Sequence, residues 1–542
     1  MINFDSLTLK IFCERNSAYF ENARIQKIQQ PSRHELIFFI RTKGETKKLY
    51  INFNPQFYHI CFINQETEKL RNIQIPKTAP MFCMLLRKYI QNAKILRIEV
   101  PKYERIFEIY FEYFDELNEK SQLCLAVELM GKYSNVILYN YDTNVIIGCA
   151  HNVSSEKSRE RELYGMLPYV YPVKQRKKNL LKTDFSTFKN IAETDNPAKL
   201  ISSSFYYLTA SLVQDCINLI KEYNPRKLYN MLFNILNTEN EYPCIKKDYS
   251  KYYVTEFQGT FRCSDINEMI DKYFSHYQHE YIIEQLRTKI NKYINAQLIK
   301  LYNLKNKQEI QTEKIKEAEE YKNKADIISA NLYNIKRNEK FVNLYDFEGN
   351  EINVELDENK TPAENALRYY NLYKKSKTAY EHACEMLKET KSEILYFEEI
   401  KYFCENTNTI EDLNNLLEEL FEEKENTNVD IVQNIETVEF EGYKIYAGRN
   451  KKQNDYILSK ISNAEDLWFH PLNAAGAHII VKTHKIKVPD SVILKAAEIT
   501  KEFSSQKNNS KTPIIYTKRK YVKKANKKQA FVTYKNETEI II

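Results

Sequence analysis

Glycine is scarce in this sequence, with only nine among 542 residues. So few glycines leave little room for glycine-rich phosphate loops, and the patterns G-x-x-x-x-G-K-[ST], G-x-G-x-x-G, G-x-S-x-G and H-E-x-x-H do not occur. The ten cysteines include no C-x-x-C pair, which argues against a zinc ribbon or a disulfide framework. We therefore expect no catalytic residues, no metal and no cofactor.

Long apolar runs are also lacking. No stretch of about eighteen apolar residues occurs, and the first ten residues, MINFDSLTLK, do not show the basic-then-apolar order of a secretory signal. These absences predict a cytoplasmic protein. At 542 residues the chain is too long for one hydrophobic core, so two to four domains are expected.

Charge is distributed unevenly along the chain. The net charge is +7, yet residues 501–542 alone hold eleven Lys or Arg against three Glu, an excess of eight. Just upstream, residues 405–430 hold nine acidic residues and one lysine. A basic end of this kind predicts an anionic partner such as a nucleic acid. The alternative is a solvated lysine-rich face with no partner.

The N-terminal 178 residues alternate strand-like runs with turn signals. Five runs are β-branched and aromatic with rough period-two alternation, whereas 79–90 has helical spacing behind a proline. The runs are ELIFFIR (35–41), KLYINFN (48–54), HICFI (59–63), RIFEIYFEYF (105–114) and NVILYN (135–140). They predict a mixed α/β domain over 1–178, and the short helical segments that follow predict a small helical module over 179–262.

Two long polar-apolar helices are predicted between 263 and 430. In the second, Ala366, Tyr373, Tyr380, Leu387 and Ile394 recur every seven residues, which is the spacing of a coiled-coil seam. A hairpin around Glu348-Gly349-Asn350, within about 337–361, joins the two helices. They can therefore fold back on each other as an antiparallel coiled-coil arm.

The last segment, 431–542, alternates short strands with one helix (491–503). The expected strands are YKIYAG, DYILSKI, AHIIVK, PIIYTK, QAFVTY and TEIII. This is a small basic α/β domain. The complete chain is thus predicted to be an α+β multidomain protein with four parts: a mixed domain, a helical module, a coiled-coil arm and a basic C-terminal domain.

The stretch DLWFHPLNAAGAH (466–478) contains the only tryptophan of the chain. His470 and His478 with the nearby Asp466 could be a metal site, but a third ligand would have to come from elsewhere, so structural or RNA-contacting histidines are preferred. Alternation places Asp466, Trp468 and His470 on one face of an edge strand. Trp468 either faces outward as a stacking platform for nucleic acid or fills the core.

A carboxylate and a guanidinium stand side by side at Glu104-Arg105, in VPKYERIF. Such a pair can read nucleotide edges, although an ordinary surface salt bridge is the simpler explanation. The run ELMGKYSNVIL (128–138) adds Glu128 and Lys132 as candidates.

Several of these segments together resemble the NFACT family nearly from end to end. The resemblance is carried by PSRHELIFFIR, APMFCMLLRKYI, ELMGKYSNVIL, SDINEMIDKYF, ADIISANLYNI, PAENALRYYNLYKKSK, GRNKKQND and DLWFHPLNAAGAH, in that family's order. It implies an NFACT-N domain, a helix-hairpin-helix module, a coiled-coil arm with a middle hairpin, and an NFACT-R domain.

The resemblance also implies a function. Family members bind large ribosomal subunits that carry stalled peptidyl-tRNA, recruit alanine tRNA and support template-free C-terminal tailing of the nascent chain. The ribosome performs the peptidyl transfer, so the factor itself is no enzyme. A small S4-like protein, RqcP, is a further implied partner, and no membrane is involved.

Site residues follow from the matched segments. The family's Asp-Arg pair for tRNA falls on Glu104-Arg105, with glutamate in place of aspartate, and Glu128 and Lys132 are expected to contribute to tRNA binding. The residues expected to contact RNA or the ribosome are Arg449, Asn450, Lys451, Lys452, Asp466, Trp468, His470, His478, Lys523, Lys524, Lys527 and Lys528.

Two other functions are weighed against this one. An older family name implies a surface adhesin that binds fibronectin, which the lack of a recognisable signal or anchor opposes. The NFACT-N fold also resembles DNA glycosylases, but those need an N-terminal Pro-Glu and a zinc ribbon, and this sequence has neither.

Overall fold

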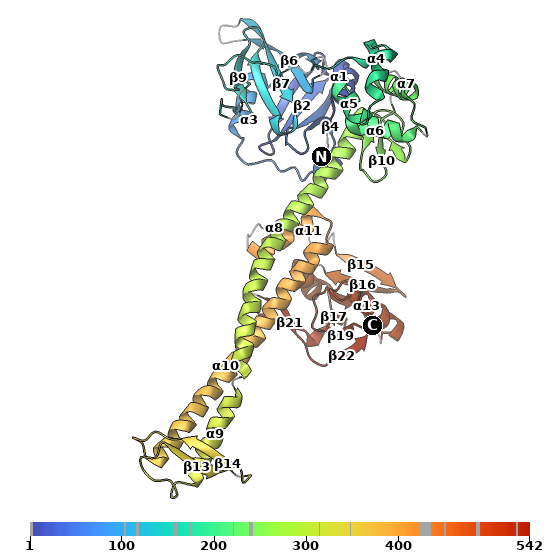
Figure 1. Ribbon diagram of the computed structural model, residues 1–542. Coiled ribbons are helices and arrows are strands. Elements are labelled where there is room, and N and C mark those ends of the chain that lie inside the picture. Colours follow the sequence, from blue (N-terminus) through green and yellow to red (C-terminus); the bar gives the residue numbers. More distant parts are fainter. Residues whose placement is uncertain are drawn as a thin grey trace. The chain divides into compact units, whose positions relative to one another are not determined.

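A computed structural model shows the helices and strands of the chain (Figure 1). It describes residues 4–101, 104–114, 119–156, 158, 160–173, 176–220, 222–237, 242–313, 315–346, 348–421, 435–448, 451–483, 488–526 and 529–542. By internal contacts the chain divides into two compact units, 1–282 and 283–542. In the described ranges, no helix is long and apolar enough to cross a membrane. The fold class is confirmed as α+β multidomain, whereas the four segment boundaries stay predictions.

The first unit opens with a helix, α1 (Ser6–Phe20), and two antiparallel sheets. The Asp5 side chain accepts a hydrogen bond from the Thr8 amide at 2.8 Å and so caps α1. The first sheet consists of β1 (Arg24–Gln29), β2 (Glu35–Thr42), β3 (Glu45–Asn52) and β4 (His59–Ile63) in that order. The second consists of β5 (Ile95–Glu99), β6 (Ile106–Phe114), β7 (Lys120–Glu128), β8 (Asn135–Asn140) and β9 (Val145–Cys149).

All five runs predicted as strands in this region are strands. The turn between β2 and β3 supports their pairing. Lys43 and Gly44 both have positive φ (46° and 88°), as a two-residue turn that matches the twist of its strands requires. The predicted helix at 79–90 is α3 (Met81–Ile90), and a shorter α2 (Gln65–Leu70) precedes it. Aromatic contacts of Phe12 and Phe20 with Phe62 and Phe107 pack α1 between the two sheets.

Among the described residues of the predicted helical module there are four short α-helices, each begun by a capping side chain. Asp184, Asn196, Thr209 and Asn224 cap α4 (Phe185–Ala192), α5 (Pro197–Ser204), α6 (Ala210–Leu219) and α7 (Pro225–Leu236). A small sheet, not predicted, follows: β10 (Cys244–Lys246), β11 (Tyr252–Tyr253) and β12 (Thr260–Arg262). Strands of two or three residues are too short to show alternation in the sequence.

The arm is built from α8 (Ile266–Glu313), which begins in the first unit, and from α9 (Ile315–Ala330) and α10 (Pro362–Asn406). Tyr302 of α8 donates a hydrogen bond to Glu398 of α10 at 2.5 Å, and Lys401 donates to Asn295 at 3.2 Å, so the helices run antiparallel. On the predicted seam, Ala366 and Ile394 are buried while the three residues between them are half-buried. A shorter α11 (Ile410–Phe421) follows α10.

The predicted hairpin is confirmed at the end of the arm (Figure 1). It consists of β13 (Phe341–Tyr345) and β14 (Glu351–Glu355), paired from Phe341↔Glu355 to Tyr345↔Glu351. Gly349 has φ +89° in the turn, a conformation that favours glycine. Buried Leu344 and Val354 pack against Ile328 of α9, so the hairpin closes the apolar seam.

A six-stranded antiparallel sheet forms the C-terminal domain. Its order is β15-β16-β18-β17-β19-β22, with a separate β20–β21 hairpin. The strands are β15 (Glu436–Phe440), β16 (Tyr443–Gly448), β17 (Leu467–Pro471), β18 (His478–Val481), β19 (Pro513–Lys518), β20 (Lys523–Asn526), β21 (Gln529–Thr533) and β22 (Thr538–Ile541). The predicted helix is α13 (Asp490–Glu502), which contacts β17, β18 and β19.

Two predictions for this domain are wrong. The run DYILSKI is not a strand, because α12 (Lys451–Tyr456) continues into one turn of π-helix over Ile457–Ile461. Its buried residues Ile457 and Leu458 are adjacent, which alternation in a strand would not give. The segment DLWFH is not an edge strand either, since β17 pairs with β18 on one side and β19 on the other.

Candidate RNA-binding surfaces

The Glu104-Arg105 pair lies at the start of β6, beside the turn that follows β7. The Arg105 carbonyl accepts a hydrogen bond from the Leu129 amide at 2.8 Å, and this fixes the backbone at the end of the sheet. Arg105 Nη1 donates to the Tyr58 hydroxyl at 3.0 Å, and its guanidinium lies 5.6 Å from the centre of that ring. Tyr58 is buried, so it gives the half-buried guanidinium a rigid support.

A third charged residue, Lys177, joins this pair. Its Nζ donates to the Ser202 carbonyl at 2.9 Å. Partial burial and the nearby Arg105 guanidinium both lower the pKa of Lys177, while Glu104 opposes the change. Arg105 and Glu104 thus both lie near enough to Lys177 to affect its pKa. A phosphate group would relieve the repulsion between Arg105 and Lys177, so the Glu104–Arg105–Lys177 cluster has the charge of an anion site.

Lys132 lies on the turn η1 (Gly131–Tyr133), whose Gly131 is next to the buried Tyr58 ring. Lys132 is exposed, and its Nζ lies 4.9 Å from the centre of the Tyr133 ring. Tyr133 is itself 65% exposed. An exposed ring beside a lysine can stack on a base while the lysine meets a phosphate.

Glu128, predicted to bind tRNA, is buried and engaged inside the protein. Its carboxylate pairs with Arg161 and accepts a hydrogen bond from the Tyr169 hydroxyl at 2.9 Å. With no exposed area it cannot contact a partner directly. The prediction for Glu128 is wrong in that respect, because the sequence does not show that Arg161 and Tyr169 fold back over it.

Trp468 has no exposed area, so the outward orientation considered for it is wrong. Alternation correctly placed it on the same face as His470, whose ring stacks on it at 5.7 Å and 4°. The outward orientation assumed that one face of the sheet at β17 is exposed, whereas both faces are covered. Phe469 packs on Tyr516 on one face, and Trp468 packs with Ile457, Ile480 and Ile515 on the other.

Asp466 and His478 are buried as well, and their prediction as direct RNA contacts is wrong for the same reason. Asp466 accepts hydrogen bonds from Lys482 Nζ at 2.7 Å and from the amides of Asn463 and Thr483 at 2.7 and 3.0 Å. Burial opposes its charged form, but these donors hold the pKa of Asp466 below its usual range. Asp466 thus joins the turn before β17 to the end of β18. His470 is half-buried under Trp468.

Exposed basic residues of this domain gather between β19 and β20. Lys520 and Tyr521 follow β19, Lys523 begins β20, and all three are exposed. Lys520 Nζ lies 5.3 Å from the Tyr521 ring centre. Lys518 and Lys520 both contact Glu465 at 2.7 Å, which lowers the pKa of that carboxyl group to about 2. Tyr521 therefore offers the exposed aromatic surface that was sought at Trp468.

The other predicted contacts of this domain are only partly described. Lys451 and Lys452 begin α12, and Lys524 lies in β20, but their side chains fall outside the described residues. Arg449, Asn450, Lys527 and Lys528 also fall outside them. Lys523 is thus the one predicted lysine of this group whose side chain is placed, and it is exposed.

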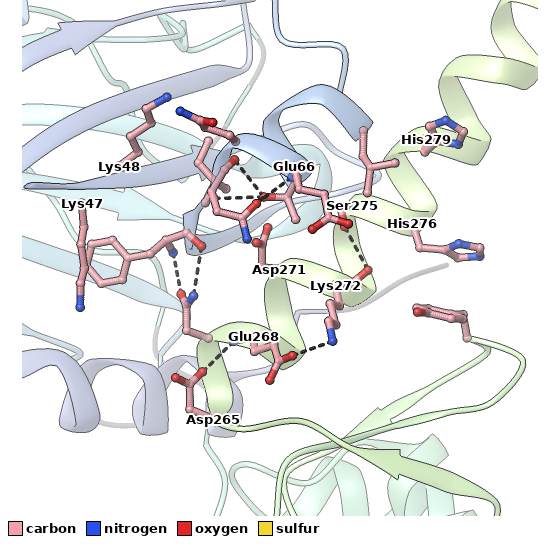
Figure 2. A pocket seen from close by; sticks show the side chains of 18 of the residues that line it. Lys47, Lys48, Glu66, Asp265, Glu268, Asp271, Lys272, Ser275, His276 and His279 are labelled. Atoms are coloured by element: carbon pink, nitrogen blue, oxygen red, sulfur yellow. Dashed lines mark hydrogen bonds and ion pairs between the residues drawn. The ribbon is translucent and has the colours of Figure 1, made fainter. Parts of the chain in front are cut away.

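A pocket of about 870 Å³ opens in the first unit between β3, α2 and the start of α8 (Figure 2). Figure 2 shows Lys272 beside Glu268, and their ion pair measures 2.6 Å. Three lysines line the pocket against four carboxylates. Lys48 is paired too, with Glu68. Carboxylates outnumber lysines in this lining, so the pocket lacks the positive excess that a phosphate chain requires.

Sequence reasoning missed Lys177, Tyr133 and Tyr521. A signal existed for Lys177, because VKQRKKNLLK (173–182) is a visible basic run. No pattern distinguishes Tyr133 and Tyr521 among 41 tyrosines, since their exposure depends on turns that only the fold defines.

Comparison with known proteins identifies the family. Residues 5–428 match the NFACT N-terminal and middle domains, and residues 434–534 match the NFACT protein RNA binding domain. The chain is 27% identical to the Rqc2 homolog RqcH of Bacillus subtilis (strain 168), over 96% of this chain and 94% of that one. It is 26% identical to the Rqc2 homolog RqcH of Streptococcus pneumoniae (serotype 2, strain D39), over 98% and 96%.

A solved structure of the N-terminal part of a fibronectin/fibrinogen-binding protein from Streptococcus suis covers 51% of this chain and all of its own, at 24% identity. Its TM-score of 0.43 carries no argument for adhesion. The match to the NFACT N-terminal and middle domains spans most of the sequence, and the RNA-binding domain follows it in order. This chain belongs to the NFACT family.

Proposed function

We propose that this chain is a ribosome-associated quality control factor. It binds large ribosomal subunits that carry stalled peptidyl-tRNA and recruits tRNA, with alanine tRNA as the expected species, for template-free C-terminal tailing of the nascent chain. Peptidyl transfer stays with the ribosome. The observation that carries the proposal is the Glu104–Arg105–Lys177 cluster in a chain that also has an NFACT RNA-binding domain.

The cluster supports tRNA binding through charge and rigidity. Arg105 is oriented by a hydrogen bond to buried Tyr58, so little side-chain freedom is lost when a partner binds. Lys177 adds a second positive charge at the same place. Lys132 and Tyr133 lie on the adjacent turn and supply a further cation and an exposed ring. These four side chains and Glu104 form the proposed tRNA-binding surface.

The C-terminal domain supports a second contact, which we assign to ribosomal RNA. Lys520, Tyr521 and Lys523 are close in sequence and all exposed. Contacts of lysine with phosphate make the affinity for RNA depend on salt concentration and not on the base sequence. The predicted contacts at 449–452 and at Lys524, Lys527 and Lys528 belong to this same proposal. A small S4-like partner such as RqcP is part of it as well.

Charge reversal of Arg105 tests the proposal. In Arg105→Glu the recovery of tRNA with the purified protein should fall at least tenfold, while sedimentation with large subunits stays within about twofold of the unsubstituted protein. The matched control is Arg24→Glu, because Arg24 is an exposed arginine of β1 whose Nη1 donates to the Asn92 carbonyl at 3.0 Å. Equal tRNA recovery from Arg105→Glu and Arg24→Glu would overturn the assignment.

A further inference from the structure

Three possible metal ligands converge in the second unit: Glu399 of α10, His470 of β17 and His478 of β18. One donor atom from each lies within 4.8 Å of the other two. In the sequence the two histidines lacked a third ligand, and α10 supplies one from a segment far upstream. Two other contacts join α10 to this domain: Tyr402 Oη donates to the Glu502 carbonyl at 3.2 Å, and Lys507 Nζ donates to Asn406 Oδ1 at 3.0 Å.

Strand pairing fixes the two histidines relative to each other. The register of β17 and β18 pairs Trp468 with Ile480 and Phe469 with Ile479, so His470 comes next to His478. Residues directly opposite on antiparallel strands share one face, and their Cβ atoms lie about 4.5–5.5 Å apart. The two rings are 5.1 Å apart at 81°, and Trp468 contacts both. The two imidazoles are thus held by the sheet and by one indole.

Both imidazoles have a ring nitrogen that could bind a metal ion. His470 Nδ1 lies 2.9 Å from the Pro471 carbonyl oxygen, which favours the tautomer with a proton on Nδ1 and a lone pair on Nε2. A hydrogen bond of this kind commonly orients a metal-binding histidine. His478 Nδ1 is buried, and among the described residues it has no hydrogen-bond partner.

Glu399 is the carboxyl group of the cluster, and it has no compensating positive charge among the ion pairs of the described residues. Glu399 is half-buried on α10. In the part of the chain that the structure describes, no lysine or arginine forms an ion pair with Glu399. A carboxylate in such a place is costly unless a positive charge compensates it. A divalent cation between Glu399 and the imidazoles would supply that charge.

We propose that Glu399, His470 and His478 together bind one divalent transition-metal ion, for which zinc is the best fit. Two imidazoles and one carboxylate form a known zinc donor set, in which water takes the fourth tetrahedral position. Bond lengths of about 2.0–2.2 Å place ligand atoms roughly 3.4 Å apart. Small side-chain rotations would bring donor atoms now within 4.8 Å of one another to that separation. The metal would tie β17 and β18 of the RNA-binding domain to α10 of the arm.

Zinc titration of the purified full chain, free of any affinity tag and stripped by chelator, tests the site. With Zn²⁺ in competition against a chromophoric chelator, the protein should bind one equivalent. Glu399→Gln and His478→Ala should each weaken that binding at least tenfold. The matched control is Glu398→Gln, which changes the preceding residue on α10, a glutamate bonded to Tyr302 instead. Glu398→Gln should bind zinc like the unsubstituted protein.

Cobalt gives a second reading of the same site. Co²⁺ in a tetrahedral site absorbs visible light strongly, and this absorption should appear with the unsubstituted chain and be lost in Glu399→Gln. Circular dichroism confirms that each variant is folded. No bound zinc, or equal affinity in Glu398→Gln and Glu399→Gln, would overturn the proposal. The test is independent of tRNA binding, because Arg105→Glu should keep its zinc while losing tRNA.

Discussion

A buried ion pair at the base of α8 allows a quantitative prediction. Arg71 Nη1 lies 2.6 Å from Asp271 Oδ1, and the two side chains are 0% and 7% exposed. Burial raises the pKa of the Asp271 carboxyl group, and the facing Arg71 guanidinium offsets only part of that rise. The pair as a whole therefore adds little net stability, while the loss of one partner leaves an uncompensated buried charge.

Asp271→Asn should destabilise this region by about 3 kcal/mol. Removing one partner of a buried pair costs about 3–5 kcal/mol. The lower end applies because Arg71 keeps hydrogen bonds to Gln278 at 2.9 Å and to the Asp271 and Thr67 carbonyls at 3.2 and 3.3 Å. A double variant, Arg71→Met with Asp271→Leu, should recover most of the loss because no charge stays buried.

Hydrogen exchange of the first turns of α8 measures the local loss of stability in Asp271→Asn. A global unfolding curve of a multidomain chain does not resolve such a local change. A loss of 3 kcal/mol corresponds to exchange on the order of 100-fold faster. The control is Glu14→Gln, since the Lys10–Glu14 pair is 28% and 53% exposed and should be worth under about 1 kcal/mol. An Asp271→Asn effect no larger than that of the control would refute the reasoning.

Three further predictions concern other parts of the chain. His59 is buried against Phe274, and burial lowers its pKa well below the usual value. Because unfolded histidine gains a proton below about pH 6.5 and folded His59 does not, stability should fall by about 1.4 kcal/mol per pH unit there, and His59→Gln should flatten this slope in the hydrogen-exchange protection of β4 at pH 7 and 5. Asp466→Asn weakens the bond to Lys482 and should cost about 2–3 kcal/mol, seen as faster hydrogen exchange of β17 and β18, and an unchanged exchange rate would contradict the role of Asp466. Lys523→Glu should reduce the salt dependence of RNA binding by about one phosphate contact, whereas an unchanged slope would remove Lys523 from the surface.

Much of the fold is predictable from local sequence. Strands with clear alternation, such as ELIFFIR and NVILYN, are found where they were expected, and the hairpin at the end of the arm follows its glycine turn. The strand prediction for DYILSKI is wrong because the apolar residues of this run belong to a helix, which buries the adjacent Ile457 and Leu458. A pattern of seven residues cannot separate the two periods.

The candidate sites were less predictable because they depend on distant contacts. Arg105 was predicted from the sequence and stays a prediction, whereas Lys177, which lies near it, comes from a loop about seventy positions away. The burial of Trp468 could not be read from alternation, since both faces of its sheet are covered. His470 and His478 lacked a third ligand until the fold brought α10 beside them.

Sequencing the RNA crosslinked to the purified protein tests the central claim most directly. The unsubstituted chain should yield tRNA reads together with a discrete set of large-subunit ribosomal RNA reads. Arg105→Glu should lose at least nine-tenths of the tRNA reads and keep the ribosomal ones, because Arg105 belongs to the proposed tRNA-binding surface and Lys523 to the other. Crosslinks without tRNA enrichment, or tRNA reads that are equal in the Arg105→Glu variant, would contradict the account.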